Sequence, residues 1–130
     1  MRKVNKYRGI HIHVYSENKH LDGRWIYGYL ADENYINSPE LEGEFLVDKD
    51  TVGQYIGIKD KNGNEIYEKD IVLIDGEDEY FVVEWDNDTA RFVMNSETLT
   101  VSFDNYWGYQ VKVTGNMYKN ADLLKEAGNE

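Results

Sequence analysis

The stretch of sequence that decides the fold is residues 53–72, which read GQYIGIKDKNGNEIYEKDIV. At its centre stands Asn62-Gly63, with residues that alternate between apolar and polar on either side. Asn-Gly is a strong β-hairpin signal, because both residues tolerate the positive φ angles of a type I′ turn. We therefore expect a hairpin here, with strands over residues 51–58 and 65–67 and a turn over residues 60–64.

The same alternation extends in both directions from this hairpin. Upstream, Ile10 and Ile12 alternate with His11 and His13, which predicts a strand whose two histidines lie on its solvent face. The further strands that the pattern predicts lie over residues 24–30, 44–47, 70–75, 80–85, 90–94, 99–103 and 109–113. Near the end of the chain, Asn120 can N-cap a helix over residues 121–127.

Short strands at this spacing predict a mainly-β fold. We expect a curled sheet or pseudobarrel of short antiparallel strands, capped by the C-terminal α-helix, because closure removes sheet edges that would otherwise aggregate. A length of 130 residues is typical of one domain. We expect a single domain over residues 1–130, possibly with an N-terminal hairpin lobe over about 8–50 and a barrel lobe over about 51–124.

Composition argues against several classes of protein. The net charge of −11 repels phosphate backbones over roughly the 8 Å Debye length, so duplex DNA is not an expected partner. Cysteine is absent, so no disulfide framework and no thiolate zinc site is expected, as in a reducing cytoplasm. No stretch approaches the roughly 20 apolar residues of a membrane span, so we expect no membrane association.

The charges are unevenly distributed. Basic residues concentrate in residues 1–20, whereas residues 60–88 hold eleven acids against Lys61 and Lys69. This asymmetry favours a homo-oligomer assembled head to tail, or a basic partner protein. If the acids over residues 75–88 shared one continuous face, they could also mimic nucleic acid in a host protein's binding groove. The simpler interpretation is a solvated acidic surface that keeps the chain soluble.

Two segments resemble the YopX family of small phage and prophage proteins. They are residues 53–72 and residues 113–124, which read VTGNMYKNADLL, and an upstream Trp25-Ile26-Tyr27-Gly28 strand extends the resemblance over about residues 8–124. The resemblance implies a β pseudobarrel capped by a helix, a phage or prophage setting, and hence the cytoplasm of a bacterial host. It implies no activity, because the family has no established function.

The family-like positions are polar, aromatic or glycine residues, for which we expect mainly structural roles. They are Gln54, Tyr55, Gly57, Asp60, Asn62, Gly63, Tyr67, Glu68, Asp70, Gly115 and Asn116. The sequence departs from the family at Lys69, where Gly is frequent, and at Ala121, where Pro is frequent. If position 69 requires a positive φ, Lys69 costs about 1 kcal/mol there.

The sharpest chemical signal is the spacing of His11, His13 and Glu17, an H-x-H-x3-E pattern. Period two places both imidazoles on one face of a strand, where they could share a metal ion. We favour an exposed polar strand face, because no second group of ligands follows in the sequence. No catalytic motif is found and no cofactor is expected, so the sequence indicates a protein that is not an enzyme.

The function we expect is therefore that of a phage or prophage accessory protein, non-enzymatic, that binds protein or self-assembles. One alternative is a small nucleic-acid-binding module that uses the basic N-terminal arm, Arg2, Lys3, Lys6 and Arg8, with aromatic side chains stacking on bases. Another is a histidine-based metal-binding protein.

Overall fold

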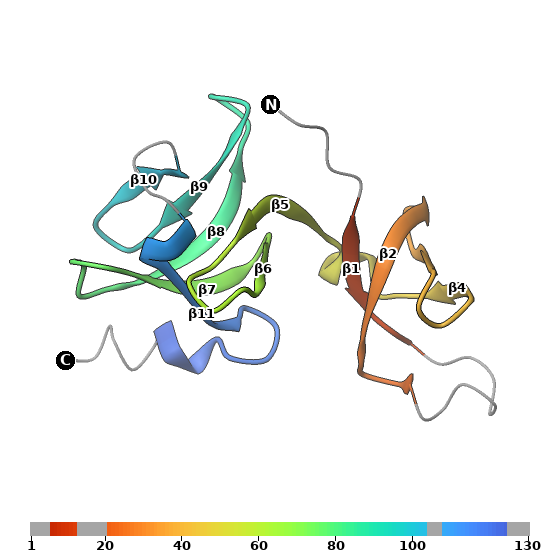
Figure 1. Ribbon diagram of the computed structural model, residues 1–130. Helices are drawn as coiled ribbons and strands as arrows, with labels where there is room; N and C mark the ends of the chain where they lie inside the picture. Colours follow the sequence, from red (N-terminus) through yellow and green to blue (C-terminus); the bar gives the residue numbers. More distant parts are fainter. Residues whose placement is uncertain (1–5, 13–20, 104–107, 125–130) are drawn as a thin grey trace. The chain divides into compact units, whose positions relative to one another are not determined.

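Over residues 6–12, 21–103 and 108–124, which the computed structural model describes, the chain forms eleven strands in two antiparallel sheets. Contacts divide it into two compact units, Met1–Tyr55 and Ile56–Glu130. The units are coloured from red to yellow and from green to blue in Figure 1. The mainly-β prediction with antiparallel strands is confirmed.

The first unit contains four short strands and the beginning of a fifth. They are β1 (Tyr7–Ile10), β2 (Trp25–Asp32), β3 (Tyr35–Ser38), β4 (Gly43–Leu46) and the start of β5 (Gly53–Lys59), with a 3-10 helix, η2 (Lys49–Thr51), before β5. The sheet order is β4-β3-β2-β1-β5. The sheet curls, because Val47, just after β4, pairs with His11, just after β1.

A small apolar core holds the first unit together. Ile26, Ile36 and Val47 are each at most 1 % exposed, and three further side chains pack on them. Burying each aliphatic side chain contributes about 1.5–3 kcal/mol. Gly28 allows β2 to approach β3, because a Cβ atom there would collide with the carbonyl oxygen of Asn37.

The second unit contains the remaining strands. They are β6 (Glu65–Tyr67), β7 (Asp70–Ile74), β8 (Tyr80–Asp86), β9 (Arg91–Asn95), β10 (Thr100–Ser102) and β11 (Val111–Asn116), with the 3-10 helix η4 (Gly108–Gln110) before β11. Its five-stranded sheet has the order β10-β9-β8-β7-β11, and β6 neighbours β5. The larger core lies here, with Ile66, Val72, Phe81, Val83 and Met94 all fully buried.

The hairpin predicted from Asn62-Gly63 is present, but the turn type predicted for it is wrong. Gly63 has φ 83°, whereas Asn62 is not among the residues with positive φ, so the type I′ turn is excluded. The N–H group of Gly63 donates to the carbonyl oxygen of Asp60 at 3.0 Å. This is a type I-like turn followed by a left-handed glycine, the usual alternative in a slightly longer hairpin loop.

Neither sheet closes into a barrel over the described residues, so the curled-sheet form of the prediction holds and the closed form does not. The apolar side chains form two separate cores, one in each unit, whereas a closed barrel would enclose a single core. A short helix begins after Asn120, with residues 122–124 helical at the end of the described part. Across the described ranges, no helix is long and apolar enough to cross a membrane.

Candidate functional site

Asp60 is the centre of the family-like hairpin. Its Oδ1 atom accepts hydrogen bonds from the N–H groups of Asn62 at 2.9 Å and Asn64 at 2.8 Å. Its Oδ2 atom accepts from the N–H group of Val113 at 2.9 Å, which ties the turn to β11. Burial opposes ionisation of this carboxyl group, but the three N–H donors outweigh it and lower the pKa of Asp60. Both oxygens are therefore occupied by backbone groups.

Asp70 and Tyr67 form a second buried pair. The N–H group of Tyr67 donates to Oδ2 of Asp70 at 2.8 Å, and both residues are at most 2 % exposed. The Tyr67 hydroxyl donates to Oε1 of Glu65 at 3.0 Å. The turn between β6 and β7 contains Glu68, which is half-buried. These contacts fix the tight connection between the two strands.

Lys69 occupies this same turn in a left-handed conformation, with φ 69°. Its N–H group donates to the carbonyl oxygen of Val83 at 2.7 Å, and its own carbonyl oxygen accepts from Met117 at 2.9 Å. Its ammonium group lies 2.8 Å from Oε2 of Glu84, and this hydrogen bond raises the pKa of Lys69. The condition stated for position 69, a positive φ at a residue with a side chain, is therefore met.

The Met117 contact joins the two family-like segments. Beside it, the Asn116 N–H group donates to Oδ1 of Asn120 at 3.1 Å, so the Asn120 side chain turns back toward β11. Gly115 lies at an irregularity in the register of β11 and β7. A Cβ atom at Gly115 would lie 2.5 Å from Oδ1 and 2.8 Å from Cβ of Asn120, which explains the glycine.

The remaining family-like residues lie in β5. Gln54 pairs with Tyr7 of β1, and the N–H group of Tyr55 donates to the carbonyl oxygen of Lys6 at 2.8 Å. Gly57 has φ 90°, a conformation that favours glycine. The eleven family-like residues thus lie along β5 and β6, in the turns that follow them, at the start of β7 and in β11.

The prediction that His11 faces solvent is wrong. His11 is 2 % exposed, and its Nδ1 atom lies 2.6 Å from the carbonyl oxygen of Leu46. A carbonyl oxygen only accepts, so Nδ1 carries the hydrogen, and Nε2 is buried with no partner among the described residues. The ring packs edge-on against Phe45. The alternation misplaced His11 because the chain beyond β1 pairs with Val47, and Ile12 is the exposed residue, at 44 %.

The histidine metal site, which was not the favoured interpretation of the sequence, remains an untested alternative. His13 and Glu17 lie outside the described residues. Within the ranges that are described, no group of three or more His, Asp or Glu side chains is arranged to hold a metal ion. The described member, His11, has its Nδ1 atom engaged by Leu46.

Four of the seven acidic residues between positions 75 and 88 have separate partners. Asp75 lies 2.6 Å from the ammonium group of Lys61, and Glu79 accepts hydrogen bonds from the hydroxyl groups of Ser96 and Thr98. For Glu84, burial opposes ionisation, but hydrogen bonds from Lys69 and Asn95 lower its pKa. A hydrogen bond from the Thr89 hydroxyl lowers the pKa of Asp86. Each of these four acids therefore makes contacts of its own with neighbouring residues.

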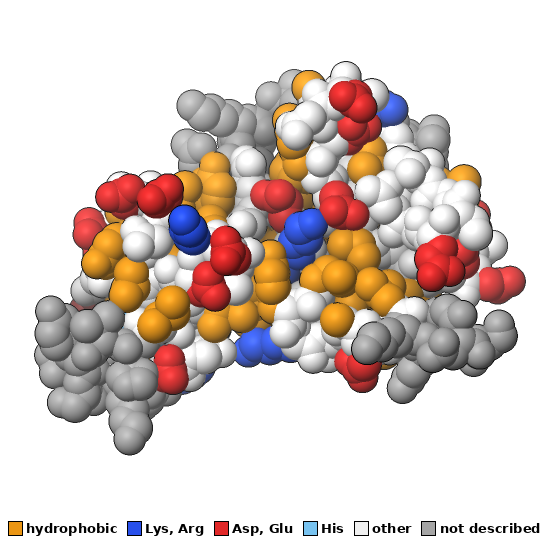
Figure 2. Space-filling view, turned by 180° about the vertical axis from the view of Figure 1, so that it is seen from behind, with side chains coloured by type: hydrophobic (Ala, Val, Ile, Leu, Met, Phe, Trp, Pro, Cys, Tyr) orange, Lys and Arg blue, Asp and Glu red, His pale blue; other side chains and the backbone are white. Residues whose placement is uncertain are grey.

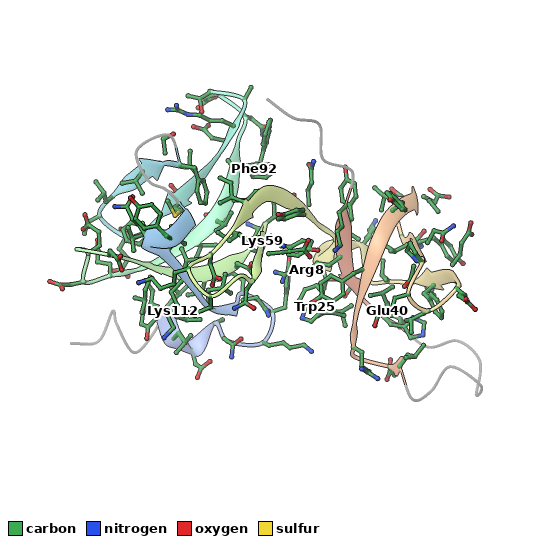
Figure 3. All side chains as sticks on the ribbon, viewed as in Figure 1. Arg8, Trp25, Glu40, Lys59, Phe92 and Lys112 are labelled. Carbon is green, nitrogen blue, oxygen red and sulfur yellow. The ribbon has the colours of Figure 1, made fainter. Side chains whose placement is uncertain are left out.

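An aromatic face lies on β2 in the first unit. Trp25, Tyr27 and Tyr29 share one side of the strand because they are two residues apart. Tyr29 is 58 % and Tyr27 is 36 % exposed. Arg8 pairs with Tyr27 across β1 and β2, and its guanidinium carbon lies 4.2 Å from the centre of a Trp25 ring (Figure 3). We call Trp25, Tyr27 and Tyr29 the aromatic face.

The structure describes two of the four residues of the basic N-terminal arm, Lys6 and Arg8. Arg2 and Lys3 lie outside the described residues, and Lys6 is half-buried. Arg8 is 6 % exposed and packs on Trp25, so it lies against the aromatic face. In the second unit, Tyr109 and Trp85 are exposed, at 67 % and 45 %. Figure 2 shows exposed hydrophobic side chains with acidic side chains scattered among them in each unit.

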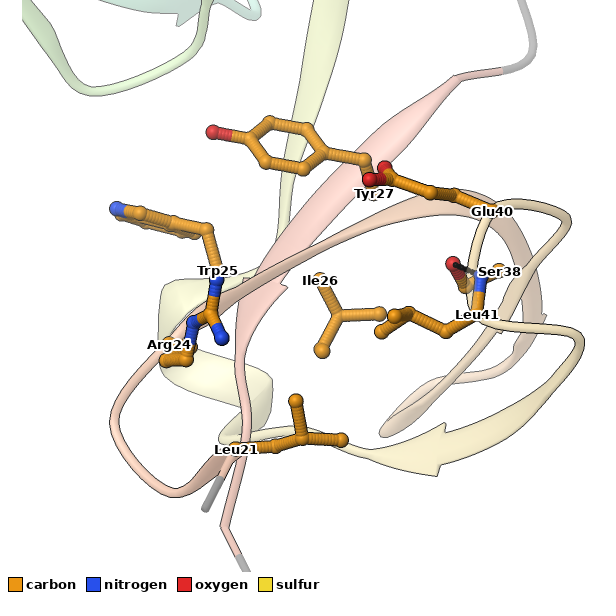
Figure 4. A pocket seen from close by; sticks show the side chains of 8 residues that line it. All are labelled: Leu21, Arg24, Trp25, Ile26, Tyr27, Ser38, Glu40 and Leu41. Carbon is orange, nitrogen blue, oxygen red and sulfur yellow. Dashed lines mark hydrogen bonds between the residues drawn. The ribbon is translucent and has the colours of Figure 1, made fainter. Parts of the chain in front are cut away.

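A cavity of about 140 Å³ lies beside the aromatic face. Its lining comes from β2 and the segments that flank it, from Ser38 of β3 and from the turn before β4: Leu21, Arg24, Trp25, Ile26, Tyr27, Ser38, Glu40 and Leu41. In Figure 4, Arg24 lies near Trp25 and Glu40 near Tyr27, with Ile26 and Leu41 between them. The Ser38 hydroxyl accepts a hydrogen bond from the Leu41 N–H group at 3.1 Å.

This cavity was not predicted, because the only strand predicted from the sequence between residues 32 and 50 lies over residues 44–47. The omitted strand is β3, whose pattern of burial alternates strictly along Tyr35–Ser38. The available signal was the Tyr35-Ile36-Asn37-Ser38 alternation between Asn34 and Pro39, two turn-forming residues. The period-two aromatic residues of β2 were a second signal.

Comparison with known proteins adds the family. No curated protein matches the chain. The family described as YopX protein matches residues 5–125, which is most of the chain and includes both family-like segments and the aromatic face. The chain therefore belongs to the YopX family.

Proposed function

We propose that the protein is a non-enzymatic accessory protein of a phage or prophage, acting in the cytoplasm of a bacterial host, and that it binds a partner protein through the aromatic face. The observation that carries this proposal is the exposure of Tyr29, at 58 %, beside Tyr27 and Trp25. Exposed aromatic residues grouped on one rigid strand are typical of the anchors of protein interfaces.

The neighbouring residues support an interface of useful size. Tyr35 and Leu41, in or near the same strands, are each 40 % exposed. Tyrosine and tryptophan bury a large area on binding while losing little conformational freedom, since each has only two side-chain torsions. Because β2 is paired on both sides, by β1 and β3, it holds these side chains in fixed positions.

Charge and acidity favour a protein partner over nucleic acid or catalysis. A net charge of −11 favours a basic protein and disfavours a phosphate backbone. The pKa values of Asp60, Glu84 and Asp86 are lowered, whereas a general acid at neutral pH requires a raised pKa. Their hydrogen bonds hold turns and strands together instead.

Site-specific photo-crosslinking tests the proposal. A benzoylphenylalanine placed at position 29 and, separately, at position 109 compares two exposed tyrosine positions, one in each unit. After irradiation in nuclease-treated bacterial lysate, the proposal expects a discrete crosslinked protein from position 29 and none from position 109. Equal crosslinking at both positions, or none at position 29, would contradict it.

A further inference from the structure

We propose that Asn62 is a modification site, at which the folded protein loses ammonia and the asparagine becomes aspartate or isoaspartate, and that isoaspartate weakens the contacts of Asp60. The site lies in the second unit and is independent of the aromatic face. Three features of the turn support it: its exposure to water, the glycine that follows Asn62, and the hydrogen bonds that Asp60 accepts on either side of that glycine.

The reaction joins the side chain of Asn62 to the backbone of Gly63. Hydroxide takes the proton of the Gly63 nitrogen, which attacks Cγ of Asn62 and forms a carbon–nitrogen bond. The bond from Cγ to the side-chain nitrogen breaks, and that nitrogen takes a proton from water and leaves as ammonia. Water then opens the five-membered succinimide ring at either carbonyl group. The net change is gain of water and loss of ammonia, and opening at the backbone carbonyl gives isoaspartate.

Gly63 leaves the approach to its nitrogen open. A residue with a Cβ atom after the asparagine crowds this nitrogen, whereas glycine does not. Asn62-Gly63 is the only Asn-Gly pair in the sequence, and both residues are exposed. Apart from the adjacent residues, no described residue has an atom within 4 Å of the place that a Cβ atom would occupy at Gly63. The Asn62 side chain has no hydrogen bond to any described residue, so it can turn toward the nitrogen.

Asp60 holds the residues around the reacting pair. Its Oδ1 atom accepts hydrogen bonds from the N–H groups of Asn62 at 2.9 Å and Asn64 at 2.8 Å. The N–H group of Gly63, between them, donates to the carbonyl oxygen of Asp60 at 3.0 Å. This one hydrogen bond must open before hydroxide can take the proton, and it lies in an exposed turn. The reaction therefore requires a local opening of the turn and no unfolding of the sheet.

Isoaspartate at position 62 is incompatible with the contacts of Asp60. Its main chain runs through the side-chain carbons, which adds an atom to the backbone between the N–H groups of residues 62 and 64. Those two donors share Oδ1 of Asp60, so they no longer reach it together. Aspartate keeps the length of the backbone and adds only a carboxylate to the turn. Because Asp60 also binds the Val113 N–H group, isoaspartate weakens the connection between the hairpin and β11.

Peptide mapping by mass spectrometry, after incubation of the full chain in mildly alkaline buffer, tests the first part of the inference. Each conversion adds the mass difference between a hydroxyl and an amino group. Asn87 is the internal control, because it is also exposed in a hairpin turn, and the next N–H group, that of Asp88, is hydrogen-bonded to Asp86 at 2.9 Å. We expect conversion at Asn62 to be at least roughly tenfold faster, because the residue after Asn87 carries a Cβ atom.

The dependence of the rate on urea shows which state of the protein reacts. At urea concentrations well below the unfolding transition, the rate at Asn62 should stay within about twofold of the rate in buffer, as expected for a local opening. A rate that rises in proportion to the unfolded fraction would show that only the unfolded chain reacts, and would overturn the inference. Equal rates at Asn62 and Asn87, or no conversion at Asn62, would overturn it as well.

Three purified forms test the effect on Asp60. They are the isoaspartate form, Asn62→Asp, which adds the charge alone, and Asn62→Gln, whose side chain is one carbon too long for the five-membered ring. In nuclear magnetic resonance spectra, the amide resonance of Val113 should shift in the isoaspartate form and stay near its wild-type position in Asn62→Gln. The midpoint of urea unfolding should be lower for the isoaspartate form than for Asn62→Asp. Equal midpoints would show that the added backbone atom leaves the Asp60 contacts intact and would overturn this part of the inference.

Discussion

Lys69 and Glu84 form an ion pair between the β6–β7 turn and β8, with Nζ 2.8 Å from Oε2, while the backbone of Lys69 is left-handed at φ 69°. The side chains of both are more than a third exposed, so the attraction between them is screened. A left-handed conformation costs a residue with a Cβ atom roughly 1–2 kcal/mol. The strain and the ion pair therefore oppose each other at one position.

The first prediction separates these two effects at position 69. Lys69→Ala keeps the backbone strain and removes the ion pair, so we expect it to destabilise the protein. Lys69→Gly removes both, and should be more stable than Lys69→Ala by about 1 kcal/mol. The free energy of unfolding in urea measures the difference. Equal stability of the two variants would show that the left-handed backbone is not strained.

The second prediction concerns Asp60, which holds the hairpin turn and β11 together. Asp60→Ala leaves the N–H groups of Asn62, Asn64 and Val113 without their acceptor, so we expect a loss of about 1–3 kcal/mol in the free energy of unfolding. Asp78→Ala, at an exposed acid in another turn, serves as the control and should change stability by less than about 0.5 kcal/mol. Similar losses from both variants would contradict this role.

The third prediction follows from the lowered pKa of Asp60. Because the folded-state pKa lies below the ordinary 3.8, the ionised group stabilises the fold above that value, and this contribution is lost as the pH falls through the folded-state pKa. Between about pH 6 and pH 3, the unfolding free energy of Asp60→Asn should therefore decrease less than that of the wild type. Parallel decreases would show that Asp60 is not the group responsible.

Individual strands and residues show which parts of the fold could be predicted from the sequence. The strand at Glu65–Tyr67 has the predicted bounds, and the neighbouring strands differ by one or two residues, because alternation and turn residues are local signals. The conformation predicted for Asn62 was wrong because the Asp60 carboxylate accepts hydrogen bonds from the N–H groups of Asn62 and Asn64. The Asn-Gly dipeptide pattern contains no information about such side-chain contacts.

The candidate site was less predictable. The burial of His11 depends on its pairing with Val47, 36 residues further along the chain, which no local pattern contains. The cavity requires β3 to place Ser38 and the following turn beside β2, and that strand was not predicted. By contrast, the requirement for a positive φ at position 69 could be stated from the family pattern, and the backbone there meets it.

The fourth prediction concerns His11 and the two separate cores. His11→Ala removes a buried ring and its hydrogen bond to Leu46, so we expect a destabilisation on the order of 2 kcal/mol. Hydrogen exchange should accelerate in β1 to β4, while β7 to β9, which surround the other core, keep their protection. Equal acceleration in both groups of strands would show that the chain unfolds as one cooperative unit.

The most direct test of the central claim is a quantitative comparison of capture from nuclease-treated bacterial lysate by the tagged wild type, Tyr29→Ser and Tyr109→Ser. Both substitutions remove an exposed tyrosine, so neither should unfold the protein, and circular dichroism checks this. If the aromatic face binds the partner, one protein is captured in fixed stoichiometry by the wild type and by Tyr109→Ser, and at least tenfold less by Tyr29→Ser, about 1.4 kcal/mol of binding free energy. Equal capture by all three proteins would contradict the claim.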